Sequence, residues 1–163
     1  MLELEYTVHR ISPAELPWMR ELNLIFFSVF EEDINYMKSP PSDAYLAEWL
    51  ADDGHFALAA QVGGRVIGGL VAYELQKFEQ ARTEIYIYDL GVAAAYRRKG
   101  VATGLIRRLQ SLAAERGASV IYVQTDRGDE AAIALYDKLG SRDQHRLGGP
   151  TGFEFRDIPA FSL

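Results

Sequence analysis

Cysteine is absent from the 163 residues, and histidine occurs only three times. Without cysteine the chain has no disulfide, no thiolate metal ligand and no thiol nucleophile. His9, His55 and His145 are too far apart in the sequence to resemble a metal-binding motif. The sequence therefore predicts no metal site.

Long apolar runs are also missing, and the first residues, MLELEYTVHR, lack the basic and then apolar order of a signal peptide. We therefore expect a cytoplasmic protein without a membrane-spanning segment. The net charge is −6, and no continuous basic face is indicated, so we expect no nucleic-acid partner.

The charge is unevenly divided along the chain. Residues 1–90 carry 15 acidic and 6 basic side chains, a net −9, whereas residues 91–163 carry 8 and 11, a net +3. Most such charged residues only form ordinary solvated surface. The division also fits a cationic ligand bound by the first part of the chain and an anionic ligand bound by the second.

Apolar residues make up 48% of the chain, enough for one domain with a core over residues 1–163. Strand patterns occupy residues 3–8, 55–62, 65–75, 83–92 and 119–125, with weaker ones at 142–147 and 152–158. Helical patterns occupy residues 13–30, 42–51, 101–116 and 129–139, and Gly117 is the expected C-cap of the third helix. Gly63 and Gly64 predict a hairpin turn, and the overall order predicts a mixed α/β fold with a later parallel crossover.

The stretch from Thr83 to Arg116 combines a strand, a basic turn containing glycine and a long amphipathic helix. The helix begins just after the turn Arg97-Arg98-Lys99-Gly100. The first amides of a helix have no intrahelical acceptor, and the helix dipole favours negative charge there. This stretch therefore predicts a cradle for an anion such as a pyrophosphate.

Two segments carry a family resemblance. The run from Arg97 to Ala102 fits the pattern R-x-x-G-x-G/A, and Ala131-x-x-Ala134-Leu135-Tyr136-x-x-Leu139-Gly140 fits a second cofactor segment. With the preceding Asp-Leu-x-Val strand, they resemble the GNAT superfamily of acetyl-CoA-dependent N-acetyltransferases over nearly the whole chain. The strings KFEQARTEIYIYDLGV, VIYVQTDRGDEAAIALYDKLG and FALAAQVGGRVIGGLVAY further resemble the type I aminoglycoside 3-N-acetyltransferases.

The resemblance implies the acetyl-CoA-binding fold of that superfamily, with a central mixed, mostly antiparallel sheet flanked by helices. It implies acetyl-CoA as cosubstrate, coenzyme A as product, and a cationic aminoglycoside such as gentamicin as the acceptor, acetylated on its 3-amino group with resulting antibiotic resistance. A homodimer is a further expectation from the resemblance. Because no cysteine can carry the acetyl group, we expect direct transfer in a ternary complex.

The resemblance also implies which residues bind the cofactor. Backbone amides from Arg98 to Ala102 would hold the pyrophosphate, and main-chain groups of the strand before the turn would face the thioester and pantetheine. A glycine inside that strand, Gly91, independently predicts a bulge or a close backbone approach. The implied residues are Leu90, Gly91, Val92, Arg97, Arg98, Lys99, Gly100, Val101, Ala102, Thr103 and Tyr136.

Acetylation of an amine requires a group that removes a proton, because an alkylammonium with a pKa near 10 is mostly protonated at neutral pH. Asp89, next to the predicted opening at Leu90, is the first candidate for this base, and Glu84 is the second. Strict alternation places Asp89 with Ile85 and Ile87, toward a core. The assignment therefore requires a bulged strand or a strand face that lines the acceptor cleft. The structural alternative is that Asp89 caps a turn.

Tyr136 is the general acid that the resemblance implies for the coenzyme A sulfur; the structural alternative is simple packing. Tyr86, Tyr88 and Tyr122 are candidates for the wall of the acceptor cleft. A polycationic acceptor requires further carboxylates. The candidates are Glu31, Glu32, Asp33, Asp52, Asp53, Glu79, Asp126 and Asp129. Two other functions fit the same sequence: acetylation of a polyamine, protein or other small amine, and binding of acetyl-CoA without catalysis.

Overall fold

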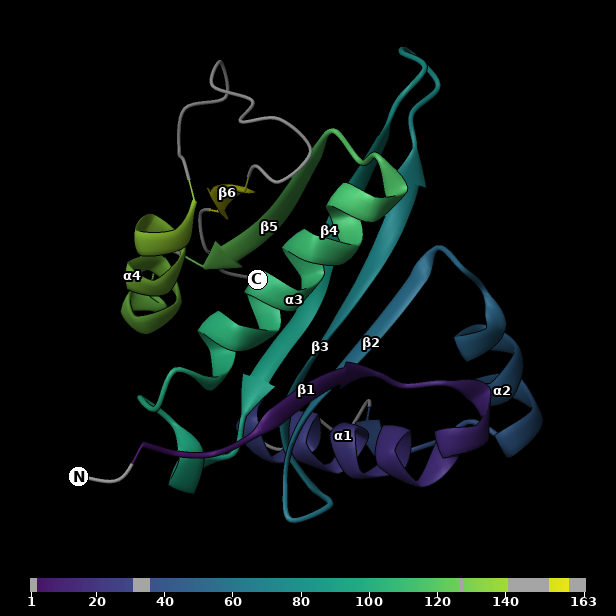
Figure 1. Cartoon of the computed structure of the whole chain (residues 1–163), viewed down its shortest axis with the longest axis vertical. Coiled ribbons are helices and arrows are strands. Elements are labelled where there is room, and N and C mark those ends of the chain that lie inside the picture. Colours follow the sequence, from purple (N-terminus) through teal and green to yellow (C-terminus); the bar gives the residue numbers. More distant parts are fainter. Residues whose placement is uncertain (1–2, 31–35, 127, 141–152, 159–163) are drawn as a thin grey trace. The chain divides into compact units, whose positions relative to one another are not determined.

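The computed structural model of the chain describes residues 3–30, 36–126, 128–140 and 153–158 (Figure 1). Strands and helices are interspersed along it, which confirms the mixed α/β class. Their bounds are β1 Thr7–Arg10, α1 Leu16–Val29, α2 Asp43–Ala51, β2 His55–Val62, β3 Arg65–Gln76, β4 Thr83–Val92, α3 Val101–Arg116, β5 Val120–Asp126, α4 Glu130–Leu139 and β6 Phe153–Ile158. The strand predicted at residues 142–147 and the turn after it lie outside the described residues.

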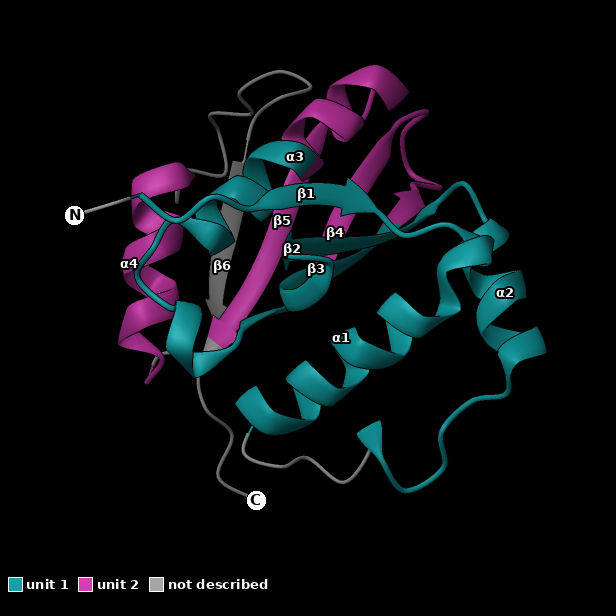
Figure 2. Cartoon of the chain, turned by 60° about the horizontal axis from the view of Figure 1, so that its bottom comes forward, with its two compact units in different colours: residues 1–73, 88–108 teal, residues 74–87, 109–163 magenta. Residues whose placement is uncertain are grey.

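Two compact units divide the chain, residues 1–73 with 88–108 (unit 1) and residues 74–87 with 109–163 (unit 2) (Figure 2). The division runs through β3, β4 and α3, so both units share these elements. A single domain over residues 1–163 therefore stays a prediction.

Unit 1 contains the predicted hairpin. β2 pairs antiparallel with β3, from His55 opposite Tyr73 to Val62 opposite Arg65. Between them Gly63 and Gly64 have φ of +57° and +80°, as a tight hairpin turn requires. The hairpin is confirmed.

The first strand was predicted in the wrong place. β1 covers Thr7–Arg10 rather than residues 3–8, and it pairs antiparallel with β2, from Thr7 opposite Gln61 to Arg10 opposite Leu58. Continuing this register, residues before Tyr6 would lie opposite the hairpin turn, where no strand partner exists. Alternation in a sequence shows which segments can form strands, but the partner strand decides where they start and end.

Helices α1 and α2 cover one face of the sheet in unit 1 and form a core with it. Buried members of this core come from both helices and from β2 and β3: Met19, Leu22, Phe26, Leu46, Leu50, Ala57, Ala59, Val66 and Val71. A Cβ on Gly69 would lie 2.4 Å from Leu22 Cδ1 and 2.5 Å from the carbonyl oxygen of Leu58. Glycine at this position therefore lets α1 lie directly on the sheet.

Unit 2 contains the predicted parallel crossover. β4 pairs parallel with β5, from Glu84 opposite Val120 to Ile87 opposite Val123, and β5 pairs parallel with β6. The sheet is therefore mixed, as expected. α3 ends at the predicted cap, Gly117, whose φ of +69° accompanies a bond from the Ala118 amide to the Ala113 carbonyl.

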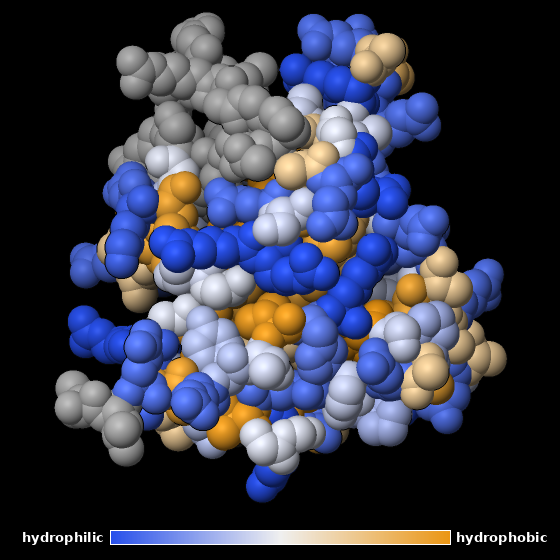
Figure 3. All heavy atoms as spheres, in the orientation of Figure 1, coloured by the Kyte–Doolittle hydropathy of each residue, from blue (hydrophilic) through white to orange (hydrophobic). Residues whose placement is uncertain are grey.

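Hydrophilic side chains cover most of the face seen in Figure 3, and apolar ones appear there in small separate areas. In the described part of the chain, no helix is both long and apolar enough to cross a membrane.

Candidate active site

The basic turn before α3 has the geometry of an anion cradle. Arg98 and Gly100 have positive φ, +60° and +81°. Left-handed residues within a turn direct neighbouring backbone amides toward one concave side, which attracts anions. The 16-residue helix α3 follows at once and adds the unpaired amides of its first turn.

Side chains of unit 1 hold this turn in place. Arg97 Nε donates to the carbonyl oxygen of Val92 at 3.1 Å, which ties the turn to the end of β4. The Tyr6 hydroxyl donates to the carbonyl of Gly100 at 3.0 Å. A Cβ on Gly104 would lie 2.3 Å from that hydroxyl oxygen, so glycine makes room for Tyr6 one helical turn further on. The predicted cofactor-binding turn thus fits a pyrophosphate in both conformation and charge.

Tyr88 and Asp89 are neighbours in β4, and both belong to the lining of one pocket. The Tyr88 ring contacts the Tyr73 ring, and Asp89 accepts a hydrogen bond from Tyr36. Asp89 therefore lies at a pocket rather than in a closed core, which meets one of the two conditions that its assignment required.

Gly91 allows a close approach, as predicted, but the approaching group is a helix. A Cβ on Gly91 would lie 2.7 Å from Val29 Cγ2 and 3.3 Å from Phe26 Cδ1, both on α1. The packing of α1 is therefore a structural reason for glycine at this position. The ladder between β4 and β5 ends at Ile87 and Val123, and β4 continues past it to Val92.

A pocket of about 190 Å³ opens in unit 1 between α1, α2, β3 and β4. Among its described lining residues Asp89 is the only one with a charged side chain. Tyr36 donates a hydrogen bond of 2.6 Å to Asp89 Oδ2. Six aromatic side chains contribute to the wall: Phe26, Tyr36, Tyr45, Trp49, Tyr73 and Tyr88. This arrangement can receive an alkylammonium and take a proton from it.

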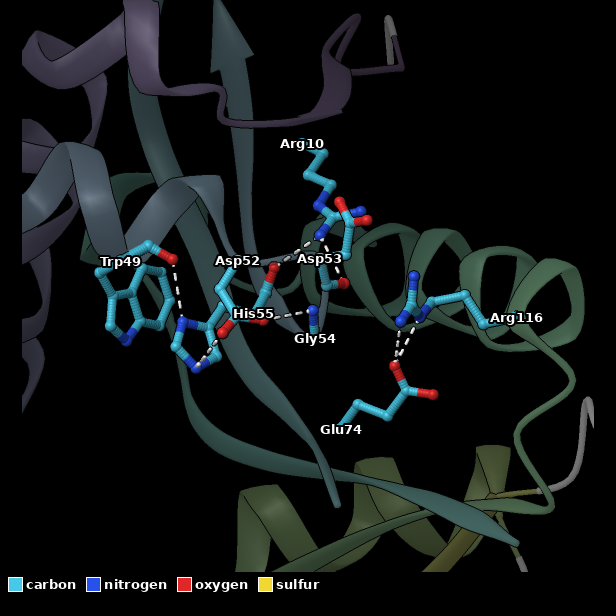
Figure 4. A network of polar contacts seen from close by, with 8 residues as sticks. All are labelled: Arg10, Trp49, Asp52, Asp53, Gly54, His55, Glu74 and Arg116. Atoms are coloured by element: carbon cyan, nitrogen blue, oxygen red, sulfur yellow. Dashed lines mark hydrogen bonds and ion pairs between the residues drawn. The ribbon is translucent and has the colours of Figure 1, made fainter. Parts of the chain in front are cut away.

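Polar contacts fix the end of α2, and with it Trp49 (Figure 4). His55 Nδ1 lies 2.9 Å from the carbonyl oxygen of Trp49, and the two rings stack with centroids 4.7 Å apart. The Arg10 guanidinium donates to the main-chain oxygens of Asp53 and His55 at 3.0 and 2.7 Å. The Gly54 amide donates to Asp52 Oδ1 at 2.8 Å. This side of the pocket is therefore held in place by its own local network.

The same figure shows an ion pair in unit 2. Arg116, in the last turn of α3, donates from Nε to Glu74 Oε2 at 2.6 Å, near the end of β3. It anchors the C-terminal end of α3 to that strand.

Three of the four described carboxylates proposed for the acceptor have local partners, and the fourth, Asp53, contacts Arg10 through its main-chain oxygen. Asp52 caps the Gly54 turn, Glu79 pairs with Lys77 at 3.1 Å, and Asp129 accepts from the Ala132 amide at 3.0 Å as the N-cap of α4. Glu31, Glu32, Asp33 and the side chain of Asp126 lie outside the described residues.

Glu84, the second candidate base, is buried and paired with two cations. Arg82 donates to Glu84 Oε1 at 2.6 Å, and Lys77 Nζ lies 3.7 Å from Oε2. A hydrogen bond to Glu79, assisted by the charge of Glu84, raises the pKa of Lys77, which keeps that partner cationic. The string KFEQAR therefore forms an ion cluster in the β3–β4 connection, and both carboxylate oxygens of Glu84 are engaged in it.

Tyr136 lies on α4 in unit 2 and is 5% exposed. Burial, and to a smaller extent the charge of Asp129, raises the pKa of its phenol well above the ordinary value of 10.0. The group therefore remains protonated at any physiological pH and can donate a hydrogen bond.

Of the three tyrosines proposed for the acceptor cleft, only Tyr88 lines the pocket. Tyr86 and Tyr122 stack on one another with centroids 4.9 Å apart, and the Tyr86 hydroxyl donates to Gln124 at 3.2 Å. Sequence reasoning missed Tyr36, Tyr45, Trp49 and Tyr73.

The family profile described as "Acetyltransferase (GNAT) family" matches residues 18–141. A crystal structure of an aminoglycoside acetyltransferase from an uncultured soil metagenomic sample is 49% identical, with a TM-score of 0.83, covering 86% of this chain and 94% of that one. A second such enzyme from soil, in complex with sisomicin, is 25% identical with a TM-score of 0.78, covering 85% and 90%.

Curated relatives carry other names. Histone acetyltransferase MCC1 of Arabidopsis thaliana is 38% identical over 155 residues, covering 85% of this chain and 61% of that protein. N-acetyltransferase 8 of Rattus norvegicus is 26% identical over 110 residues, covering 68% and 46%. The chain spans about half the length of the curated relatives it matches.

Proposed function

Because the chain belongs to the acetyltransferase (GNAT) family, we propose that it acetylates the 3-amino group of aminoglycosides such as gentamicin and thereby confers resistance. The carrying observation is the pocket in which one carboxylate, Asp89, lies among aromatic side chains. The likeness to two soil aminoglycoside acetyltransferases supports an aminoglycoside acceptor. The choice of the 3-amino group rests on the resemblance of residues 77–92 to the type I enzymes. A cytoplasmic location and a homodimer belong to the same proposal.

Acetyl-CoA, the proposed cosubstrate, supplies an acetyl group activated as a thioester. The pyrophosphate would bind the amides from Arg98 to Ala102, with a hydroxyl from Thr103 and positive charge from Arg97 and Lys99. Positive φ at Arg98 and Gly100 and the start of α3 favour this assignment. Main-chain groups of Leu90, Gly91 and Val92, beyond the end of the β4–β5 ladder, would bind the pantetheine arm.

In the proposed reaction Asp89 would remove one proton from the bound ammonium, and the neutral amine would form the new C–N bond to the acetyl carbon. As the C–S bond breaks, Tyr136 would donate its proton to the departing sulfur, and its phenolate would regain a proton from the nitrogen of the new amide. The raised pKa of Tyr136 keeps this donor protonated. Glu84 is not chosen as the base because Arg82 and Lys77 already hold it.

A free-thiol release assay with purified protein and acetyl-CoA tests the proposal. We expect turnover with gentamicin-like aminoglycosides, and mass spectrometry should place the acetyl group on the 3-amino nitrogen. Turnover restricted to polyamines or peptides would show that the acceptor belongs to that class and is not an aminoglycoside. Acetyl-CoA binding without turnover across a broad amine panel would favour the non-catalytic alternative.

Gly100→Val should raise the KM for acetyl-CoA about tenfold, because a β-branched residue at positive φ is strained by about 1–3 kcal/mol and distorts the cradle. Gly64→Val is a matched control. Gly64 has nearly the same φ, +80° against +81°, and a Cβ meets nothing within 4 Å at either site. Gly64 lies in the β2–β3 turn, so its variant should show similar destabilisation in urea unfolding but a wild-type KM. An equal rise of KM in both variants would contradict the assignment of the cradle.

A further inference from the structure

Five aromatic side chains around Asp89 form what we call the aromatic box: Tyr36, Tyr45, Trp49, Tyr73 and Tyr88. Tyr73 stands at the centre of the ring contacts. Its plane is at 86° to that of Trp49 and at 87° to that of Tyr88, with centroids 5.7 and 5.8 Å apart. Rings at right angles form corners, and a group placed in such a corner lies against the face of at least one ring. Ring faces carry partial negative charge and attract cations.

The box carries little formal charge of its own. Asp89 is the only acidic side chain among its described lining residues. Burial raises the pKa of Tyr73, and the neighbouring Tyr88, Tyr45 and Asp89 add to the effect. The phenol of Tyr73 therefore stays neutral at physiological pH, and one carboxylate balances one positive charge. A second ammonium group of a polycation would have no described carboxylate beside it in this pocket.

The pocket is also small. Its volume of about 190 Å³ is below the roughly 300–1,000 Å³ of sites that enclose drug-sized ligands. Tyr45 and Tyr88 are 60% and 61% exposed while lining the pocket, so they flank its opening. An acceptor with several rings can place only one of them inside.

We infer that the aromatic box is an ammonium-selective subsite that takes one amino-bearing ring and recognises its charge by ring faces together with Asp89. The inference deepens the proposed function. Only one part of it, the identity of the natural ligand, rests on that function. It differs from the expectation that a set of carboxylates holds the acceptor. The inference also implies that a quaternary ammonium binds the aromatic box, although its nitrogen has no proton to lose and cannot be acetylated.

Choline and its neutral isostere 3,3-dimethyl-1-butanol test this inference without turnover. Trp18→Phe leaves Trp49 as the single tryptophan, so quenching of its fluorescence reports binding in the box. Calorimetric titration of wild-type protein is the second measurement, should Trp18→Phe not fold. We expect choline to bind at least about tenfold more tightly than the isostere. Equal binding of the two compounds would overturn the inference.

Variants at the exposed Tyr88 separate the ring face from the hydroxyl. Tyr88→Leu should weaken choline binding about three- to tenfold, whereas Tyr88→Phe, which keeps the ring, should stay within about twofold of wild type. An equal loss in both variants would overturn recognition by the ring face.

The two proposals fail in different ways. If the protein binds choline more tightly than the isostere but does not acetylate aminoglycosides, the aromatic box stands and the proposed function is overturned. If it acetylates aminoglycosides but binds choline and the isostere equally, the proposed function stands and the inference about the box is overturned. Choline should also compete with the aminoglycoside and leave the KM for acetyl-CoA unchanged, because the cradle is formed by other residues.

Discussion

Asp89→Ala is expected to lower kcat/KM for the aminoglycoside by about 10²–10⁴-fold, the usual contribution of a positioned general base. The variant loses both the negative charge beside the bound ammonium and the acceptor for its proton, because Asp89 is the only acidic side chain among the described residues of the pocket. Steady-state thiol release with circular dichroism of the folded variant measures this loss.

Asp89→Asn is the matched control. The amide oxygen still accepts the hydrogen bond of Tyr36, so the wall of the pocket is preserved while the base is lost. An alkylamine has a pKa near 10, so raising the pH from 7 to 9 supplies far more neutral amine. The rate of Asp89→Asn should therefore recover with pH much more steeply than that of wild type. Wild-type activity in this variant, with a large loss in a folded Glu84→Gln, would move the base to Glu84.

Tyr136→Phe is expected to lower kcat by about 10- to 100-fold, because a hydrogen bond to a charged group contributes about 1.5–3 kcal/mol. The departing thiolate is charged only late in the reaction, so the KM values should change little. Phenylalanine fills the same volume on α4. An unchanged kcat would assign the donor role to another group and leave Tyr136 as a packing residue.

The same variant tests the environment of the phenol by a route independent of activity. Burial raises the pKa of Tyr136 in the folded state, whereas the unfolded phenol ionises near 10. The contribution of Tyr136 to stability is complete below pH 10 and decreases as the pH rises further, because only the unfolded state loses the proton readily. The free energy of unfolding of wild type should therefore fall more steeply above pH 10 than that of Tyr136→Phe. Parallel curves would contradict a buried, protonated phenol.

Local patterns in the sequence were sufficient for much of the fold and for the position of the turn proposed to bind the cofactor. The hairpin at Gly63 and Gly64, the cap at Gly117 and the helix start after Gly100 were all predicted from neighbouring residues. Each depends on backbone conformation or on periodicity within a few turns, and such information is contained in the segment itself. The position of β1 was not predicted correctly, because its partner lies some fifty residues away.

At the site, the stretch from Thr83 to Arg116 shows the same difference between what local sequence determines and what tertiary packing decides. By itself the sequence determined a strand, a basic turn and a helix, and it singled out Asp89 next to the predicted opening of the strand at Leu90. Only the tertiary structure decided that Asp89 lies at a pocket, because the other lining residues, Tyr88 apart, come from α1, α2, β3 and the segment before α2. It also decided that, among the described lining residues, aromatic rings surround Asp89 and no second carboxylate does. Those rings come from segments far apart in the sequence, and no local pattern records which side chains long-range packing brings together.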